Sequence, residues 1–199
     1  MHISQITGLI LAGGRGSRMG GVDKGLQTVS DVPMVAHVIA TLAPQVGSLM
    51  ISANRNLSAY ATFGVPVWPD ANNDFAGPLA GIQAGLKNCQ TPYLVTAPCD
   101  SPFLPDNVVS ELAKALENTA ADIAVAATSG INSKIQPQPV FMLMQTTVLI
   151  DLTAFIDEGG RKIEIWYRRL HYTEVLFQDA TPFRNINTPN ELREADNHQ

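Results

Sequence analysis

The chain has 199 residues, 45% of them hydrophobic and 16% charged, which suits one globular domain and excludes a disordered chain. Its net charge of −5 lacks the basic surplus with which a nucleic-acid-binding protein neutralises phosphates, although a few well-placed cations could still bind a small anion. No apolar run reaches the roughly 18 residues of a membrane span, and no basic start leads into a signal-peptide core. The two cysteines lack metal-type spacing, so we expect a reduced, cytoplasmic protein with no nucleic-acid or membrane partner.

Short apolar runs alternate with helical patterns along the chain. In the first half of the chain we expect a strand at Ile6–Leu11, a helix after Pro33 with Met34, Val35, Val38, Ile39 and Leu42 on its apolar side, strands at Leu49–Ser52 and Val65–Trp68, and a helix from Pro78. A strand at Tyr93–Ala97, a helix after Leu104-Pro-Asp106 and strands at Ile123–Ala127 and Val140–Met144 follow. The rest of the chain predicts helices at Thr147–Ile156 and Lys162–Leu170, a strand at Tyr172–Phe177 and a last helix at Thr188–Asp196. Strands separated by helices of this length indicate an α/β fold. We expect a three-layer sandwich around a mostly parallel, Rossmann-like central sheet, with residues 1–199 in a single domain.

Polar motifs directly follow four of these strands. A glycine-rich segment follows the first strand, Asn54 the second, Asp70 the third and Cys99-Asp100 the fourth. In a parallel sheet with right-handed crossovers these positions collect at one edge, where such sheets bind their ligands. The sequence therefore predicts a binding site at that edge.

The glycine-rich segment is built to hold phosphate groups. Leu11–Gly25 contains glycines at positions 13, 14, 16, 20, 21 and 25, with Arg15, Arg18 and Lys24 between them. Glycine allows consecutive backbone N–H groups to converge on phosphate oxygens, and the three cations neutralise phosphate charge. The spacing is neither that of a Walker A loop nor that of a dinucleotide fingerprint. A solvated turn is the plain alternative, but three cations directly behind an apolar strand favour a phosphate loop.

The motifs resemble those of a known family. Leu11-Ala-Gly-Gly-Arg-Gly-Ser-Arg-Met-Gly20, followed by Asp23-Lys24, is similar to the signature loop of the NTP-transferase superfamily. With Gly77-Pro-Leu-Ala-Gly81, Pro98-Cys-Asp100 and Asn185-Ile-Asn-Thr-Pro189 the likeness covers nearly the whole chain and is greatest to the molybdenum cofactor guanylyltransferase (MobA) family. The resemblance implies a nucleotide-diphospho-sugar-transferase-like fold whose N-terminal half binds nucleotide and whose C-terminal half binds the acceptor.

The same resemblance implies the reaction. GMP would pass from GTP to the phosphate of molybdenum-loaded molybdopterin, with release of pyrophosphate and with Mg²⁺ as cofactor. Transient contact with other enzymes of molybdenum cofactor biosynthesis, or with acceptor proteins, would follow. No strong general base is needed, because the attacking phosphate is already an anion, so positioning and electrostatics should supply most of the rate.

Asp100 is the expected metal ligand. An anionic phosphate that attacks an anionic α-phosphate needs charge neutralisation by Mg²⁺, which takes one or two protein carboxylates and fills its other positions with phosphate oxygens and water. Asp100 could instead cap the turn before Ser101-Pro102. We assign catalysis to Asp100, Lys24 and Arg18.

The expected nucleotide-binding residues lie in the loop and at the following strand ends. They are Leu11, Ala12, Gly13, Gly14, Arg15, Lys24, Ser52, Asp70 and Asp100. Asp70 and Lys24 match positions that the family uses for GTP, although Asp70 could simply cap the loop that follows it. Ser52 stands where the family pattern has asparagine, and a hydroxyl cannot offer an amide's paired donor and acceptor, so we expect the base contact to pass to Asn54 or to water.

The expected acceptor-binding residues are Asn185, Asn187 and Arg161. Thr188 and Glu191 have capping-box spacing, and the two asparagines before them alternate, so both are placed to face the cleft. The resemblance puts this segment near the pterin and allows Asn187 to help hold the metal. Arg161, next to Lys162 in a glycine turn, could grip a phosphate or could cap the preceding helix. Gln136-Pro-Gln-Pro139 resembles the family's acceptor-side loop.

The remaining reactive side chains look structural. His37 and His171 lie in or beside apolar patterns, and Cys99 has no base to activate it, so we expect direct displacement without a covalent intermediate. Two alternatives stay open. One is another nucleotidyltransferase, of the cytidylyl or sugar-1-phosphate type, and the other is a non-catalytic module that binds GTP or pterin.

Overall fold

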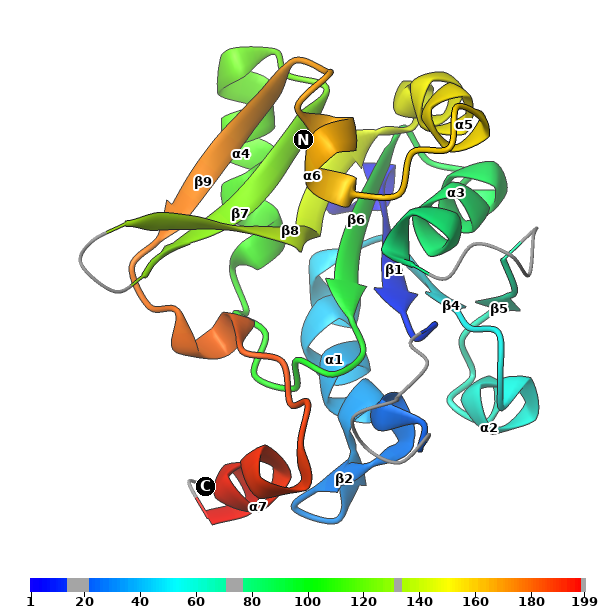
Figure 1. The fold of residues 1–199 in the computed structure, drawn as a ribbon, viewed down its shortest axis with the longest axis vertical. Helices are drawn as coiled ribbons and strands as arrows, with labels where there is room; N and C mark the ends of the chain where they lie inside the picture. The colour runs from blue at the N-terminus through cyan, green and yellow to red at the C-terminus, as the bar shows by residue number, and fades with distance from the viewer. Residues whose placement is uncertain (14–21, 71–76, 131–133, 198–199) are drawn as a thin grey trace.

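The computed structural model describes residues 1–13, 22–70, 77–130 and 134–197, and at its centre is a seven-stranded sheet of order β5-β4-β1-β6-β8-β7-β9 (Figure 1). The strands in that order are Val67–Trp68, Ser48–Ser52, Ile6–Leu11, Tyr93–Pro98, Ile135–Gln145, Ile123–Ser129 and Tyr172–Phe177. Every neighbouring pair is parallel except those that β8 makes with β6 and β7. The expected mostly parallel sheet is therefore confirmed.

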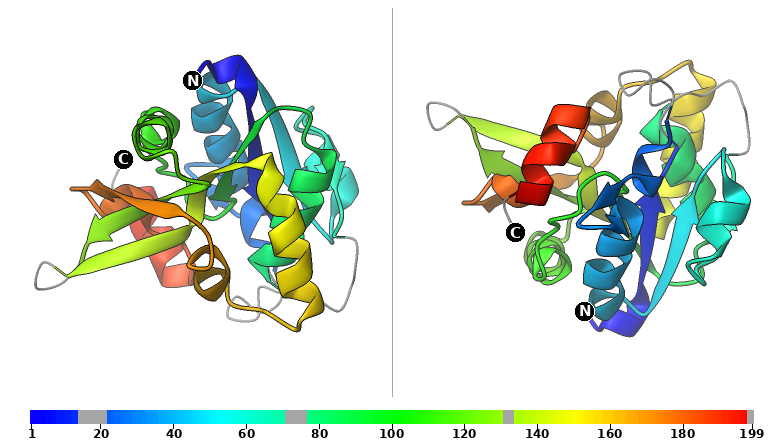
Figure 2. Two further views of the ribbon diagram at one scale, coloured as in Figure 1. Left: turned by 90° about the horizontal axis from the view of Figure 1, so that it is seen from above. Right: turned by 90° about the horizontal axis from the view of Figure 1, so that it is seen from below.

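Helices cover both faces of the sheet. The helices are α1 (Met34–Leu42), α2 (Leu57–Ala61), α3 (Pro78–Asn88), α4 (Val108–Thr119), α5 (Leu149–Asp157), α6 (Ile163–Tyr167) and α7 (Pro189–Asn197). Short 3-10 turns occupy Ile3–Gln5 (η1), Lys24–Leu26 (η3), Ala43–Gln45 (η4), Thr146–Val148 (η6) and Thr181–Phe183 (η7). One core cluster joins α1 and α4 to the sheet, and a second joins α3, α5 and α6 to the opposite face. Figure 2 shows the resulting three layers.

The central strand β1 explains how the two cores form. All six of its residues are buried, as expected of a strand that is covered on both faces and reads as one apolar run. Ile6 and Ile10 contribute to the α1–α4 core, whereas Leu9 and Leu11 contribute to the α3–α5 core. Because side chains alternate along a strand, β1 contributes to the cores on both faces of the sheet. The strand ends at the edge of the sheet, where Ala12 follows it.

A third, smaller core joins distant parts of the chain. The hairpin of β2 (Thr28–Val29) and β3 (Val32–Pro33) packs on α7, with Val29, Met34, Ile186 and Ala195 buried between them. The backbone N–H of Ser30 also donates to Asp196 Oδ1 at 2.6 Å. Figure 1 shows β2 beside α7. The hairpin follows the segment that carries Lys24, and α7 follows Asn187, so this packing brings the two segments together.

Four expectations about the elements need correction. The strand expected at Val140–Met144 begins at Ile135, so the segment Gln136-Pro-Gln-Pro139 is part of β8 and not a loop. A register shift makes this possible, because Met142 lies opposite Val125 while Gln138 lies opposite Ala126. Pro139 lies within this irregularity, and Pro137 lies outside Met142–Gln145, the part of β8 that pairs with β6, so that β8 has only β7 as a paired neighbour there. Proline is tolerated at irregularities and at unpaired edges.

The other corrections concern length. The third strand covers only Val67–Trp68, and the helix expected to run to Leu170 ends at Tyr167. Beyond Tyr167 the chain turns, and Leu170 packs back on the α3–α5 core. Neither α2 nor the β2–β3 hairpin was expected from the sequence.

Candidate active site

A cleft of about 360 Å³ opens at the carboxyl ends of β1, β4 and β6. It is lined by Leu11, Ala12, Gly13, Asp23, Lys24, Ser52, Asp70, Gly77, Pro78, Gly81, Pro98, Cys99, Asp100 and Val140. The motifs that follow the first, third and fourth predicted strands therefore do meet at one edge of the sheet. Gly14, Arg15 and Arg18 lie outside the described residues, and their phosphate-binding role stays a prediction.

Lys24 joins two of the predicted site residues. Its ammonium donates to Asp100 Oδ2 at 3.1 Å and to Asn187 Oδ1 at 2.5 Å. The three side chains come from η3, from the end of β6 and from the segment before α7. They form one half-buried cluster that holds a cation between two oxygen atoms.

Asp100 is held in a poorly solvated position. The residue is 8% exposed, and burial raises the pKa of its carboxyl group above the ordinary value. The charge and the hydrogen bond of Lys24 lower that pKa in part, because they stabilise the ionised form. Lys24 therefore stabilises the negative charge of Asp100.

The segment that carries Asn187 is fixed to the end of β6. The N–H of Ile186 donates to the carbonyl of Asp100 at 2.9 Å, and the hydroxyl of Ser101 donates to Asn185 Oδ1 at 2.6 Å. Contrary to the expectation from their alternation, neither Asn185 nor Asn187 is among the residues that line the cleft, and Asn187 contacts the cleft residue Lys24 instead. Asn185 lines a second cavity of about 280 Å³, between η7 and α7, and its amide oxygen is bound to Ser101.

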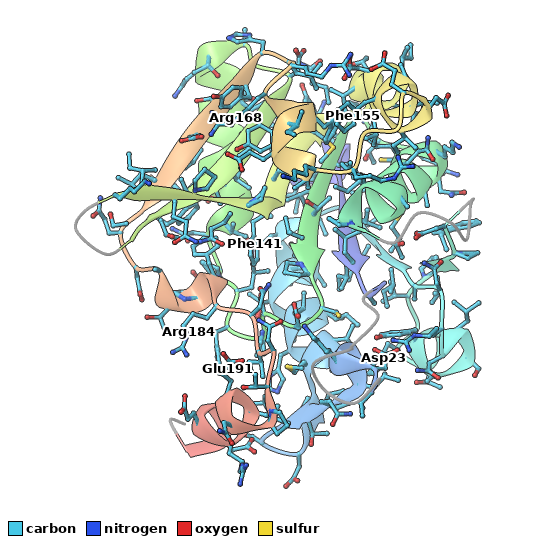
Figure 3. The ribbon with its side chains drawn as sticks, viewed as in Figure 1. Asp23, Phe141, Phe155, Arg168, Arg184 and Glu191 are labelled. Carbon is cyan, nitrogen blue, oxygen red and sulfur yellow. The ribbon has the colours of Figure 1, made fainter. Side chains whose placement is uncertain are left out.

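The expected capping box at α7 is present. Glu191 Oε2 accepts the N–H of Thr188 at 3.0 Å, and the N–H of Glu191 donates to Thr188 Oγ1 at 3.2 Å. The same carboxylate accepts the N–H of Asn187 at 2.7 Å, which lowers the pKa of Glu191. The cap therefore also fixes the backbone from which Asn187 reaches Lys24. Figure 3 shows that Glu191 and Asp23 lie at the same end of the molecule, although they come from opposite ends of the chain.

Asp70 is held by two residues at the end of β4. Ser52 Oγ donates to Asp70 Oδ1 at 3.1 Å, and Asn54 Nδ2 donates to Asp70 Oδ2 at 2.7 Å. The N–H of Asp70 in turn donates to Asn54 Oδ1 at 2.9 Å. Ser52, 1% exposed, therefore acts as a donor to the carboxylate, and the reciprocal amide contact is made by Asn54.

A third carboxylate of the cleft, Asp23, was missed as a site residue. Asp23 Oδ1 accepts the hydroxyl of Tyr60 at 2.5 Å, and Asp23 Oδ2 accepts Nδ2 of Asn56 at 2.9 Å. Both donors belong to α2 or to its N-cap, an element that the sequence pattern did not reveal. The only signal in the sequence was the Asp23-Lys24 pair itself.

Gly81 allows α3 to approach the cleft closely. A methyl group at this position would lie 2.8 Å from Leu11 Cδ2 and 2.9 Å from Ser52 Oγ. Gly81 thus leaves room for the hydroxyl that holds Asp70.

Arg161 lies elsewhere. Its guanidinium donates to the carbonyls of Gly160 at 2.7 Å and Ile156 at 3.4 Å, at the end of α5. This is the helix-capping arrangement that the sequence left open as the alternative to a phosphate grip. Arg161 is not among the residues that line the cleft, and its role at the acceptor stays a prediction.

His37 and Cys99 have structural surroundings, as expected. His37 Nε2 forms a hydrogen bond of 3.0 Å with the carbonyl of Val29. The side chain of His171 is exposed, and its structural role stays a prediction. Cys99 is buried, and burial raises the pKa of its thiol far above the ordinary value. A neutral thiol is a poor nucleophile, which agrees with direct displacement.

The site fits a hard divalent cation. Asp100 Oδ2 and Asn187 Oδ1 already converge on one positive group, the Lys24 ammonium, and carboxylate and amide oxygens are ligands that Mg²⁺ accepts. Within residues 1–13, 22–70, 77–130 and 134–197 no group of three or more His, Cys, Asp or Glu side chains could form a metal cage. A metal here would need phosphate oxygens to complete its coordination. In the same part of the chain, no helix is both long and apolar enough to cross a membrane.

The comparisons with known proteins agree with this geometry. The MobA-like NTP transferase domain family matches residues 8–172. The molybdenum cofactor guanylyltransferase of Cupriavidus necator is 58% identical over 188 residues, 94% of each chain, and that of Ralstonia nicotianae is 56% identical over 195 residues, 96% of each chain.

Solved structures share the fold at lower identity. Molybdopterin-guanine dinucleotide biosynthesis protein A from Archaeoglobus fulgidus has a TM-score of 0.77 and 23% identity, and the match covers 96% of this chain and 97% of that one. A CMP:2-keto-3-deoxy-manno-octonic acid synthetase complexed with CTP has a TM-score of 0.75 and 14% identity, over 98% of each chain. The chain belongs to the family of MobA-like NTP transferase domains.

Proposed function

We propose that the protein is a molybdenum cofactor guanylyltransferase, which transfers GMP from GTP to the phosphate of molybdenum-loaded molybdopterin and releases pyrophosphate. The observation that carries the proposal is the convergence of Lys24, Asp100 and Asn187 at the carboxyl edge of the sheet. This cluster offers a cation and two oxygen ligands to a triphosphate. Relatives that are 53–58% identical share the name molybdenum cofactor guanylyltransferase, and this name supports guanine as the base and the molybdenum cofactor as the acceptor.

The reaction is a single displacement at phosphorus. An oxygen of the acceptor phosphate forms a bond to the α-phosphorus of GTP, and the bond from that phosphorus to the oxygen bridging to the β-phosphate breaks. Pyrophosphate leaves with the electron pair. Bound Mg²⁺ would be held by Asp100, with Asn187 beside it, and would supply charge neutralisation at the α- and β-phosphates.

The protein's own residues bind and orient the substrates. Lys24 neutralises phosphate charge, and the backbone of Leu11, Ala12 and Gly13 lines the nucleotide side of the cleft. Asp70, fixed by Ser52 and Asn54, presents a carboxylate to the nucleoside. We retain Gly14, Arg15 and Arg18 as further phosphate ligands, and Asn187 on the acceptor side.

The setting of the reaction follows from its substrates. GTP and a molybdenum-loaded pterin are supplied and consumed inside the cell, and we expect a cytoplasmic enzyme that makes transient contacts with enzymes delivering or receiving the cofactor. Two free cysteines, Cys89 and Cys99, agree with a reducing compartment.

Pyrophosphate release tests the proposal. The protein is incubated with Mg²⁺, molybdate-loaded molybdopterin and each of GTP, CTP, ATP and UTP in turn. We expect release with GTP at least about 100 times faster than with the other nucleotides, because a site built to hydrogen-bond one base rejects others strongly. Release with CTP and not GTP would move the protein to the cytidylyl type. If no nucleotide gave pyrophosphate release, the enzyme proposal would fail and the protein would be a non-catalytic module that binds GTP or pterin.

The variant Asp100→Ala tests the assignment of Asp100 as the metal ligand in the same assay. It should lose turnover by at least about 100-fold while it still binds the pterin, because the carboxylate acts on the nucleotide phosphates. Equal activity in this variant would refute the metal assignment.

A further inference from the structure

We propose that Tyr60 and Asp23 are positioning residues for Lys24, and that they hold its ammonium against Asp100 and the incoming triphosphate. The inference rests on the proposed function, because it takes Lys24 as the residue that binds phosphate. Neither residue reaches the reacting atoms in this role. They act through the backbone on either side of Lys24.

The residue before Lys24 is fixed by hydrogen bonds. The two carboxylate oxygens of Asp23 are bound separately, one by the hydroxyl of Tyr60 and the other by the amide of Asn56. Tyr60 is fully buried, and burial raises the pKa of its phenol far above the ordinary value. The hydroxyl therefore keeps its proton and stays a donor at any pH at which the protein works.

The residue after Lys24 is fixed by packing. Gly25 is buried, and a methyl group at this position would lie 2.6 Å from Tyr60 Oη and 3.0 Å from Cys99 Sγ. Tyr60 and Cys99 thus enclose the backbone on one side. Cys99 directly precedes Asp100, so the same contact sets the distance between the two ends of the Lys24–Asp100 ion pair.

The hydrogen bonds to Asp23 also keep its carboxylate from competing with Asp100 for the Lys24 ammonium. Asp23 and Lys24 are neighbours in the chain, and both line the cleft. A carboxylate without partners at this position would attract the Lys24 ammonium away from Asp100. Because Tyr60 and Asn56 satisfy Asp23, the ammonium is left to Asp100 and Asn187.

The ring and the hydroxyl of Tyr60 have separable roles. The ring belongs to the α1–α4 core, where phenylalanine would fill nearly the same volume. The hydroxyl donates only to Asp23 among the described residues. Tyr60→Phe therefore removes the positioning contact and keeps the packing. Tyr93→Phe is the matched control, because Tyr93 packs on the same core and its hydroxyl makes no hydrogen bond within the described part of the chain.

The first measurement needs no turnover. Lysine residues of the folded protein are acetylated with a limiting reagent, and the modification of Lys24 is followed by mass spectrometry against exposed Lys114 in the same molecule. We expect Tyr60→Phe to raise the relative rate at Lys24 several-fold, because an ammonium that is no longer held between Asp100 and Asn187 is more accessible to the reagent than the partly buried one of the wild type. Tyr93→Phe should leave the ratio unchanged.

The second measurement is a double-mutant cycle. Tyr60→Phe should lower kcat with GTP about tenfold, in line with the loss of one hydrogen bond to a charged group. In a Lys24→Met background the same substitution should cause less than about a twofold further loss, because the two residues act through one ammonium. A merely structural tyrosine would reduce activity by the same factor in both backgrounds, and that result overturns the proposal.

A third variant covers the case in which Tyr60→Phe fails to fold. Asn56 has a left-handed backbone, with φ of 51°, so Asn56→Gly removes its amide without strain. It should change Lys24 reactivity in the same direction as Tyr60→Phe but less, and no change would overturn the proposal. If the wild-type protein releases no pyrophosphate, the proposed function fails, whereas the acetylation ratio still decides the positioning role.

Discussion

The ammonium of Lys24 lies 3.1 Å from a carboxylate oxygen of Asp100, although the two residues are 76 positions apart in the chain. The contact pairs a partly buried carboxylate with a positive charge. On the proposed function, this is also where a divalent cation would bind, and Lys24 would neutralise Asp100 in the absence of nucleotide and metal. Several measurable properties depend on this pair and on the groups around it.

Lys24→Met should destabilise the protein in a pH-dependent way. Both contributions of Lys24 lower the pKa of Asp100, so the variant raises that pKa further above its ordinary value. At pH 8 the ionised carboxylate loses its counterion, and we expect a loss of about 1–3 kcal/mol in the free energy of unfolding. Near pH 4 Asp100 takes up a proton and the loss should shrink. Denaturant titration at both pH values measures the difference. Lys114→Met, which breaks the exposed pair with Glu111, should cost little at either pH.

Asp100→Asn should abolish turnover without lowering stability. Burial raises the pKa of Asp100, so the folded state prefers the neutral form, and the ionised side chain reduces stability as the pH rises through that raised pKa. Asparagine keeps the shape and removes the charge. At pH 8 we expect the free energy of unfolding to be unchanged or higher by about 1 kcal/mol. A clear fall in melting temperature would contradict this expectation.

Asn54→Ala should weaken nucleotide binding more than Ser52→Ala does. Asn54 makes two hydrogen bonds with Asp70, whereas Ser52 makes one. At about 1 kcal/mol for each bond, the KM for GTP should rise about tenfold or more in the first variant and about fivefold in the second, with little change in kcat. Asn88→Ala is the control, because its amide only binds the carbonyl of Ala84 near the end of α3. A larger effect at Ser52 than at Asn54 would contradict the assignment.

Gly81→Ala and Gly85→Ala should separate site effects from packing effects. A methyl group on Gly81 would press on Leu11 and on Ser52 Oγ, whereas one on Gly85 would lie 2.4 Å from Leu9 Cδ2 in the core. Both variants should lose about 1–3 kcal/mol of stability, reduced by the better helix propensity of alanine. Well below the melting temperature, only Gly81→Ala should raise the KM for GTP. A normal KM in that variant would show that Ser52 does not need the space.

Glu191→Ala should loosen Asn187. Its carboxylate accepts the N–H groups of Asn187 and Thr188, so its removal should cost about 0.5–1 kcal/mol and raise the KM for the acceptor. These N–H groups lower the pKa of Glu191, so the stabilisation is present above its ordinary pKa and is lost as the pH falls through the lowered one. Glu191→Gln, which keeps an acceptor oxygen, should lose less.

The parts of the fold that could be predicted are those with strong local signals. β1 and β6 are buried on both faces and read as continuous apolar runs, and Thr188 with Glu191 has the three-residue spacing of a helix cap. The placement of Asp70 and Asp100 at one edge followed from the parallel order of the strands.

The parts that could not be predicted depend on contacts between distant residues. The five residues of α2 are too few to form a helix without tertiary support, so the 37-residue separation between Tyr60 and Asp23 hid their hydrogen bond. Asn185 alternates with Asn187 as a cleft residue should, but Ser101 binds its amide oxygen and turns it to another cavity. The segment Gln136-Pro-Gln-Pro139 was expected as a loop from its family resemblance, because the local sequence does not show that β8 has an irregular register and a single paired neighbour there.

The small core between the β2–β3 hairpin and α7 also sets the order in which the site can form during synthesis. Val29 and Met34 leave the ribosome early, whereas their partners Ile186 and Ala195 emerge more than 150 residues later. The nascent chain can build β1, β4 and β6 before α7 exists, but Lys24 cannot gain its contact with Asn187 until the last helix docks. A partly made chain therefore carries an incomplete site, and it is the final helix that completes it.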